Sequence, residues 1–187
     1  MGCLLGKPDG TFRDGEFIGK VERGQRNGRG SFVWNGAKAG QRYDGDWEDD
    51  KPHGRGIRTI DGDEFIGEFQ DGIIEGLGIL TRANGEKSVG NWINEKRDGY
   101  VAVTATDGSI YEGEFKFDRK HGQGVHTAGS VVHFEEWDNG TLVKQTVFNP
   151  GLHSHKQLLS LCREETAKAD ALALQIRQRG PTPTGRV

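Results

Sequence analysis

The sequence predicts an all-β repeat array: an elongated, single-layer, twisted antiparallel sheet of successive β-hairpins, followed by one C-terminal α-helix. Three observations lead to this fold class. Glycine accounts for 30 of the 187 residues, more than twice its usual share of about 7%. Hydrophobic residues make up only 33%, which is thin for a domain of this length built on one thick core. A short unit recurs along the chain, so each copy needs to bury only a little surface.

The repeated unit carries an aromatic residue, a glycine and an apolar or aromatic residue at alternate positions. A turn containing glycine or an acidic residue follows, and then come a polar residue, a glycine, any residue and a small residue. Five copies occupy residues 17–30, 43–56, 65–78, 88–101 and 111–124, and a partial sixth begins at His133. We expect the array to extend over residues 1–151, with partial repeats at its ends.

One β-hairpin accounts for each copy. Alternate residues of a strand face the same side, so Tyr43, Gly45 and Trp47 share one face. The opposite face carries acidic residues such as Asp44 and Asp46 and is expected to face solvent. The second strand opens with Gly-x-Gly, and glycine weakens a strand unless something packs on its bare backbone. We expect the aromatic rings of neighbouring hairpins to pack there.

The unit closely resembles the MORN repeat (membrane occupation and recognition nexus). Residues 111–115 (Tyr-Glu-Gly-Glu-Phe) and 121–124 (His-Gly-Gln-Gly) nearly reproduce the pattern of that family, and the resemblance covers about residues 10–145. The fourth copy departs from it, with Ser88 in the aromatic position and Val101 in place of a glycine. The resemblance implies an aromatic-lined groove and scaffolding roles in cytoskeletal or ciliary structures or at membranes.

The aromatic face is the predicted binding site, because a single sheet has no second layer to cover it. Four hairpins would form a groove on the order of 30–40 Å long, which accommodates a helix of ~20 residues. The expected ligand is therefore a helical or extended protein segment. The alternative is that the rings are simply the core of a thin sheet or are covered by the chain's own helix. The expected groove residues are Tyr43, Trp47, Phe65, Phe69, Trp92, Tyr111 and Phe115.

The C-terminal segment, residues 152–179, is expected to form one helix, with a disordered tail at residues 180–187. Its apolar residues recur at helical spacing, and Gly180-Pro181 ends the pattern. Such a face needs a partner surface. Either the helix packs on its own array, covering the last sheet edge or the aromatic face, or it binds another protein or a second copy. The expected interaction face is Leu158, Cys162, Ala169, Leu172 and Ile176.

Charge and cysteine content argue against several classes of protein. The chain has a net charge of −3, and residues 1–151 carry 19 Lys and Arg against 25 Asp and Glu, which gives −6. An acidic array does not favour direct binding to nucleic acid or to anionic lipid. The two cysteines cannot build a disulfide framework, which fits a reducing, cytoplasmic location. No apolar run reaches the ~18 residues of a membrane-spanning helix.

The sequence offers no catalytic or metal-binding constellation, so we expect no enzyme activity, no cofactor and no metal. The glycines have strand-pair spacing and do not open a helix as a phosphate loop does. Cys162 is interpreted as a small apolar residue. His53 and His121 occupy equivalent positions three repeats apart, and about 29 Å of sheet separates them, so they cannot share a metal.

The N-terminus leaves a membrane role open. Myristoylation of Gly2 and palmitoylation of Cys3 would together anchor the chain stably, although Gly6 stands where a serine or threonine is usual. The other interpretation is that residues 2–10 form the second strand of a preceding half-repeat. The main hypothesis is a non-catalytic scaffold or adaptor in a cytoskeletal or ciliary assembly. The alternatives are a membrane-associated adaptor and a regulatory module of a larger enzyme, and open sheet edges would allow a homodimer.

Overall fold

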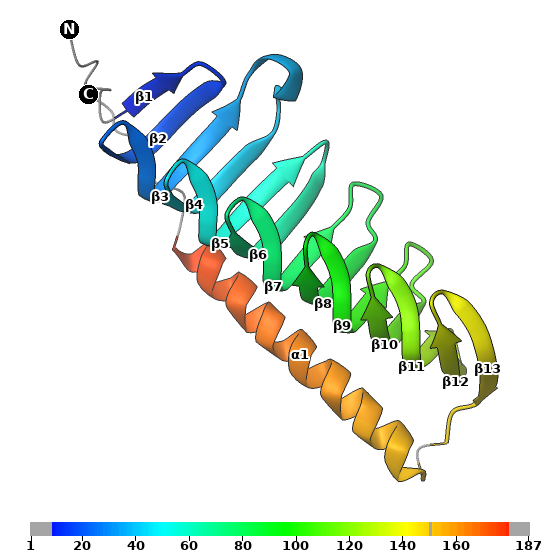
Figure 1. Ribbon diagram of the computed structural model, residues 1–187. Coiled ribbons are helices and arrows are strands. Elements are labelled where there is room, and N and C mark those ends of the chain that lie inside the picture. The colour runs from blue at the N-terminus through cyan, green and yellow to red at the C-terminus, as the bar shows by residue number, and fades with distance from the viewer. Residues whose placement is uncertain (1–8, 150, 180–187) are drawn as a thin grey trace, which may run out of the picture.

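The computed structural model describes residues 9–149 and 151–179, and within them thirteen strands form one antiparallel sheet. Every strand pairs with its neighbours in sequence, and Figure 1 shows the hairpins stacked along one axis. The predicted fold class is confirmed. The strands are β1 (Asp9–Phe12), β2 (Gly15–Glu22), β3 (Gln25–Trp34), β4 (Arg42–Glu48), β5 (Lys51–Ile60), β6 (Asp63–Gln70), β7 (Ile73–Thr81), β8 (Lys87–Ile93), β9 (Lys96–Thr104), β10 (Ile110–Lys116), β11 (Arg119–Ala128), β12 (Val131–Asp138) and β13 (Thr141–Val147).

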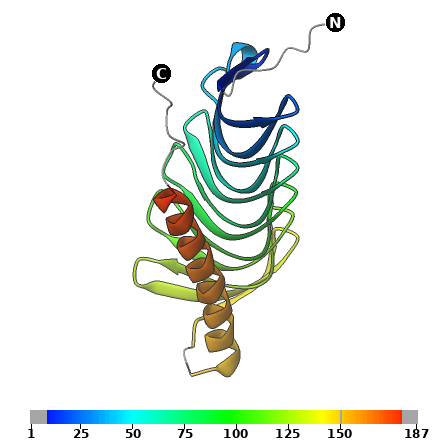
Figure 2. The same ribbon diagram turned by 90° about the vertical axis from the view of Figure 1, so that its left-hand side faces the viewer.

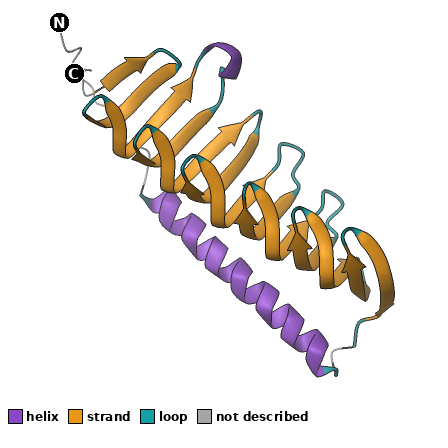
Figure 3. Cartoon of the chain, viewed as in Figure 1, coloured by secondary structure: helices purple, strands orange, loops and turns teal. Residues whose placement is uncertain are grey.

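Two helical elements accompany the sheet. A single 3-10 turn, η1 (Gly36–Lys38), lies in the longer connection between β3 and β4. The helix α1 (His153–Gln178) follows β13 and runs back along the array, as Figures 1 and 3 show. The tail at residues 180–187 lies outside the described residues.

Each hairpin is bent, so the sheet has a concave and a convex face, as the U-shaped layers in Figure 2 show. A register shift recurs at the same place in the first strand of successive units, for example between Gly45 and Trp47 and between Gly67 and Phe69. A β-bulge of this kind bends the strand and increases its twist. The bend therefore follows from the repeat itself. We call the face with the aromatic residues the concave face and the opposite one the convex face.

A repeated backbone hydrogen bond fixes the spacing of neighbouring hairpins. The last turn residue of one hairpin donates its N–H to a carbonyl in the second strand of the preceding hairpin. These donor residues have positive φ, for instance 67° at Asp50 and 87° at Gly72, which explains the glycine or acidic residue there. The pairs are Asp50 to Arg26 (3.1 Å), Gly72 to Pro52 (2.7 Å), Glu95 to Ile74 (3.0 Å), Asp118 to Arg97 (2.9 Å) and Gly140 to Lys120 (2.8 Å).

The aromatic rings of the concave face pack edge to face and on glycine backbone. The ring centroids of Tyr43 and Phe69 lie 5.0 Å apart, and those of Phe65 and Trp92 lie 5.4 Å apart. A Cβ added at Gly56 would overlap the Tyr43 ring, so only glycine allows this approach. Edge-to-face pairs stabilise a core beyond the burial of their area. The expected packing of rings on the Gly-x-Gly backbone is therefore present.

In the fourth hairpin, β8–β9, a small residue stands at the aromatic position and a larger one stands at the glycine position. Val101 pairs with Gly90 on one side and Gly113 on the other, and it is 1% exposed. Ser88, in the aromatic position, is also 1% exposed, and its Oγ accepts a hydrogen bond from Arg97 Nη1 at 3.4 Å. A branched side chain at the glycine position thus occupies space that a ring fills in the other hairpins. The two departures from the repeat compensate each other.

The helix α1 packs on the convex face. Ala169, Leu172 and Ile176 share one buried cluster with Ile66 and Val89. The expectation that the helix covers the last sheet edge or the aromatic face is therefore wrong. The expectation that the face opposite the rings faces solvent is wrong along α1 as well.

The physical reason lies in the differences between hairpins. The second hairpin carries Asp44 and Asp46 on the convex face, whereas the third and fourth carry Ile66 and Val89 at equivalent places. Isolated apolar side chains on an otherwise polar face need cover, and the apolar side of α1 supplies it.

Candidate binding surfaces

Two recesses lie on the concave face in neighbouring parts of the array. The first has a volume of about 300 Å³, and the second has a volume of about 310 Å³. Rings from the aromatic positions contribute to both, and charged side chains line the rest. Residues lining the first are Arg58, Ile60, Asp61, Asp63, Phe65, Ile74, Leu80, Trp92 and Glu95. Residues lining the second are Arg97, Val103, Ala105, Ser109, Tyr111, Phe115, Asp118, Lys120 and His126.

The predicted groove residues all point to the concave face, and all are buried, with exposed fractions from 0% at Tyr43 to 6% at Phe115. The structure divides them between two clusters. Five of the seven share one cluster, namely Tyr43, Trp47, Phe65, Phe69 and Trp92. Tyr111 and Phe115 belong to a second cluster with Val101. The rings thus form the supporting floor of the concave face.

Cationic side chains lie over these rings. The Arg97 guanidinium carbon is 4.8 Å from the Phe115 centroid, and Lys120 Nζ is 3.8 Å from the Tyr111 centroid. A cation over an aromatic face is attracted by the ring quadrupole. Sequence reasoning missed these residues, although Arg97 and Lys120 both directly precede the polar-Gly pair of their unit. The repeat pattern sets no residue type at that position.

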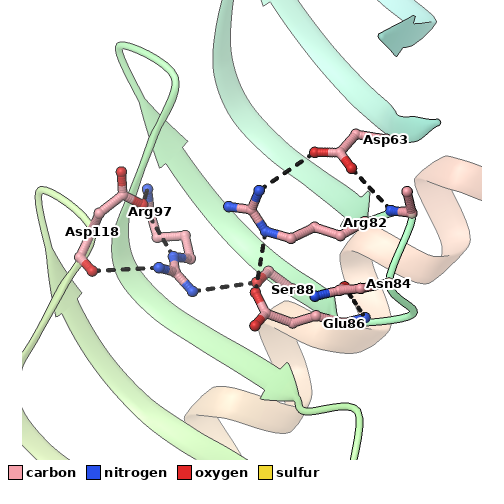
Figure 4. A network of polar contacts seen from close by, with 8 residues as sticks. Asp63, Arg82, Asn84, Glu86, Ser88, Arg97 and Asp118 are labelled. Carbon is pink, nitrogen blue, oxygen red and sulfur yellow. Dashed lines mark hydrogen bonds and ion pairs between the residues drawn. The ribbon is translucent and has the colours of Figure 1, made fainter. Parts of the chain in front are cut away.

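An arginine–aspartate clamp ties the wall of the second recess to the next hairpin. The backbone N–H and Nε of Arg97 both donate to Asp118 Oδ1, each at 3.0 Å (Figure 4). Arg26 and Asp50 repeat the same pair of bonds at 2.8 and 3.1 Å. Arginine in the strand thus accompanies aspartate in the following turn. The clamp adds charge-assisted bonds to the backbone link between hairpins.

A polar cluster closes the C-terminal end of the concave face. Glu135 occupies the glycine position of the sixth unit and is 2% exposed. Its carboxylate accepts hydrogen bonds from Trp137 Nε1 at 2.9 Å and Gln145 Nε2 at 3.0 Å. Lys120 Nζ lies 3.7 Å away, and burial lowers the pKa of Lys120 while Glu135 opposes that shift. A paired buried carboxylate at this place takes the room that a ring has in earlier hairpins.

The predicted interaction face of α1 contacts the sheet. Ala169, Leu172 and Ile176 lie over the middle hairpins, while Leu158 and Cys162 pack near Val125 at the far end. Burial raises the pKa of the Cys162 thiol to about 12, so the group is a thiol and not a reactive thiolate at neutral pH. Ion pairs flank the apolar contact, and they join Arg177 to Glu64 at 2.8 Å and Arg163 to Glu112 at 3.6 Å.

The proposed acylation residues, Gly2 and Cys3, lie outside the described residues. Among residues 9–149 and 151–179, no group of three or more His, Cys, Asp or Glu side chains is arranged to hold a metal ion. None of the helices in that part of the chain is long and apolar enough to cross a membrane.

These features define a repeat protein with an open sheet whose recesses are shallow, mixed in charge and floored by aromatic rings. Comparison with known families gives a more particular assignment. The family model of the MORN repeat matches four times, at residues 17–36, 43–63, 65–87 and 111–130. The chain therefore carries MORN repeats, as the resemblance predicts. The matched ranges leave out the fourth hairpin, where Ser88 replaces the aromatic residue and Val101 replaces a glycine.

Three relatives resemble about half of the chain. Alsin from Homo sapiens is 34% identical over 96 residues, which is 48% of this chain and 6% of Alsin. The ALS2 C-terminal-like protein is 30% identical over 105 residues in Homo sapiens and 35% identical over 106 residues in Bos taurus. These matches cover 53% and 54% of this chain and 11% of each relative. The chain thus matches a small part of each relative's length.

MORN repeats are typically non-catalytic modules that mediate protein or membrane interactions. The repeats and the relatives together indicate that this chain is a protein-interaction module.

Proposed function

We propose that this chain is a non-catalytic scaffold or adaptor that binds an extended protein segment along its concave face. One observation carries the proposal: two recesses of similar volume lie along that face, and α1 packs on the opposite one. The concave face therefore combines apolar floor, charged walls and access to a partner.

The spacing of the recesses favours a segment over a small molecule. Each recess is at the lower limit of about 300 Å³ for small-molecule sites. The strands β6 and β10, which contribute Phe65 and Tyr111, are four strands apart, or about 19 Å at ~4.8 Å per strand. About six residues of extended chain span that distance. One segment can therefore contact both recesses at once.

The recess linings predict the composition of the segment. Leu80 and Ile74 offer apolar side chains in the first recess, and Val103 does so in the second. The walls alternate in charge, as in the pair Arg58 and Glu95, whose Nη1 and Oε1 atoms are 2.9 Å apart. We expect a segment with spaced apolar residues between charges of both signs. Apolar contacts would supply affinity, and the charges would set orientation.

Photo-crosslinking from two adjacent positions of β5 tests the choice of face. Ile60 lines the first recess on the concave face, whereas Thr59 lines a recess on the convex face. A photoreactive amino acid is placed at each position in turn in the full chain, and partners are identified by mass spectrometry. We expect a partner that crosslinks from position 60 and not from position 59. Crosslinking of that partner mainly from position 59 would contradict the proposal.

We also propose that the scaffold acts in a cytoskeletal or ciliary assembly. The resemblance to the MORN repeat, which implies scaffolding roles in such structures, supports this proposal. Fluorescently tagged chain is expected to colocalise with tubulin or with axonemal markers. The charge-reversed variant Arg58→Glu is expected to lose that localisation, because Arg58 lines the first recess. A diffuse wild-type signal would contradict this part of the proposal.

A further inference from the structure

A third recess lies on the convex face, at the C-terminal end of α1. Its volume is about 270 Å³, and strands β3 to β6 and α1 contribute to its walls. In Figure 1 the red end of α1 lies beside β5. Residues far apart in sequence thus come together here. The charged residues that line the recess are Arg29, Arg42, Arg55, Arg177, Arg179, Asp44 and Glu64.

The recess has an excess of positive charge. Five arginines and two carboxylates line it, and the carboxylate of Asp46 lies beside it. With all three carboxylates counted, the difference is +2 in a chain whose net charge is −3. Three of the arginines pair with carboxylates: Arg42 with Asp44 at 3.1 Å, Arg177 with Glu64 at 2.8 Å, and Arg179 with Asp46 at 3.0 Å. Arg55 Nη1 donates to the neutral Gln175 Oε1 at 3.1 Å. Cations gathered within one Debye length repel one another unless an anion joins them.

We propose that this recess binds a phosphate group carried by a soluble ligand. A guanidinium presents a planar fork of donors that matches phosphate oxygens two at a time. A phosphate monoester also concentrates about −1.5 to −2 charges in one group, whereas a carboxylate carries one. The arginine side chains of the Arg42 and Arg177 pairs are exposed, and ion pairs at the surface contribute little to stability. Arg177 and Arg42 can therefore turn from their carboxylates to phosphate at small cost.

The surroundings favour a soluble ligand over a membrane surface. The array carries a net charge of −6 over residues 1–151, and carboxylates of Asp44, Asp46 and Glu64 lie at or beside the recess. A flat anionic membrane would meet this negative field over a wide area. A compact ligand enters the recess and meets mainly the arginines. The site is on the other face from the concave recesses and is independent of the function proposed for them.

Bound phosphate would also fasten the end of α1 to the sheet. Arg177 belongs to the helix, while Arg55 belongs to β5. A phosphate that contacts both would connect the helix to the strand. The hydrogen bond between Arg55 and Gln175, 120 residues apart in sequence, already connects the same two elements. Hydrogen exchange in the last two turns of α1 is expected to slow when the ligand binds.

Pyrophosphate is the probe for the test, titrated into the full chain by calorimetry at low ionic strength. The variants Arg55→Gln and Arg177→Gln each remove one arginine from the recess. Matched controls are Arg58→Gln, on the concave face of the same strand, and Arg163→Gln, in the N-terminal half of the same helix. We expect each recess variant to weaken binding about tenfold or more. We expect the controls to stay within about twofold of the wild type.

Three outcomes would overturn the proposal: no binding of pyrophosphate by the wild type, equal affinity in all four variants, or greater loss in the controls. Circular dichroism checks that each variant is folded. If Arg55→Gln is not folded, the test uses Arg177→Gln, because the Arg177 side chain is exposed. Vesicles containing phosphatidylserine and a phosphatidylinositol phosphate form a second arm. We expect no sedimentation of the chain with them, and vesicle binding without pyrophosphate binding would assign the arginines to a membrane.

Discussion

The two faces of the sheet reach stability in different ways. On the concave face, rings such as Phe65 and Trp92 pack on one another and on glycine backbone, so this face carries its own core. On the convex face, Ile66 and Val89 are separate apolar side chains that become buried through α1. The aromatic face is the one that needs no cover from its own chain. It can therefore stay open to a partner while the helix serves the other face.

Truncation of a concave ring is the strongest way to test this difference. Phe65 is 2% exposed and lies over the glycine pair of its hairpin. Phe65→Ala should lower the free energy of unfolding by about 3–5 kcal/mol, because it removes a buried ring and leaves a cavity. Urea unfolding followed by tryptophan fluorescence measures the change. Phe117→Ala is the control, since Phe117 is 53% exposed and should change stability by only about 0.5 kcal/mol.

The contact of α1 with the convex face should be weaker per residue. Leu172 lies on the side of α1 that faces the sheet and is 6% exposed, while Leu174 on the same helix is 57% exposed. Leu172→Ala should cost about 2–3 kcal/mol, and Leu174→Ala should be close to neutral. Helical circular dichroism and hydrogen exchange of α1 report the loss. A larger effect of Leu172→Ala than of Phe65→Ala would reverse the comparison between the faces.

The fourth hairpin allows a sharper test of how the concave face is packed. Val101→Gly alone should leave a cavity, and Ser88→Tyr alone should overfill the site. The double variant restores the usual ring-over-glycine arrangement, so it should be more stable than the sum of the two changes predicts. We expect a coupling of about 1–2 kcal/mol in a double-mutant cycle by urea unfolding. Additive effects would show that the two residues do not exchange volume.

The smallest expected effect is a pH dependence beneath α1. Burial raises the pKa of the Cys162 thiol from its usual 9.0 to about 12. The folded state therefore keeps the proton that the unfolded state loses, and stability is present in full below about pH 9 and falls as pH rises towards 12. Between pH 8 and pH 10 the loss should be about 1 kcal/mol. The Cys162→Ala variant should lack this part of the slope, and an identical slope in both proteins would contradict the assignment.

The period of the repeat was enough to predict the hairpin array and the side of each strand on which the rings lie. Alternation along Tyr43, Gly45 and Trp47 carries that information locally, and the same is true of the helical spacing in residues 153–178. The face covered by α1 could not be predicted in this way, because it depends on Ile66 and Val89, which are distant in sequence from the helix. Acidic residues at the equivalent places of the second and fifth hairpins predict a polar convex face, and Ile66 and Val89 depart from that pattern.

The candidate sites were predicted only in part. The aromatic positions mark the concave face, but the rings are its floor. The walls come from residues such as Arg97, at a position for which the repeat sets no residue type, and Arg58, which follows the second repeat unit. The arginine recess is assembled from β3 to β6 and the end of α1. Its residues are separated by more than 100 positions in sequence, so no local pattern in the sequence predicts the recess.

Charge reversal on the two faces of one strand tests the central claim most directly. Arg58 lines a concave recess, and Arg55, three residues earlier, lines the convex one. For the partner segment found by crosslinking, the dissociation constant is measured with the full chain and with each variant. Arg58→Glu should weaken binding about tenfold or more, since it sets a carboxylate against Glu95 and changes the wall of the recess, while Arg55→Glu should leave the affinity within about twofold. Loss of affinity in Arg55→Glu with none in Arg58→Glu would contradict binding on the concave face.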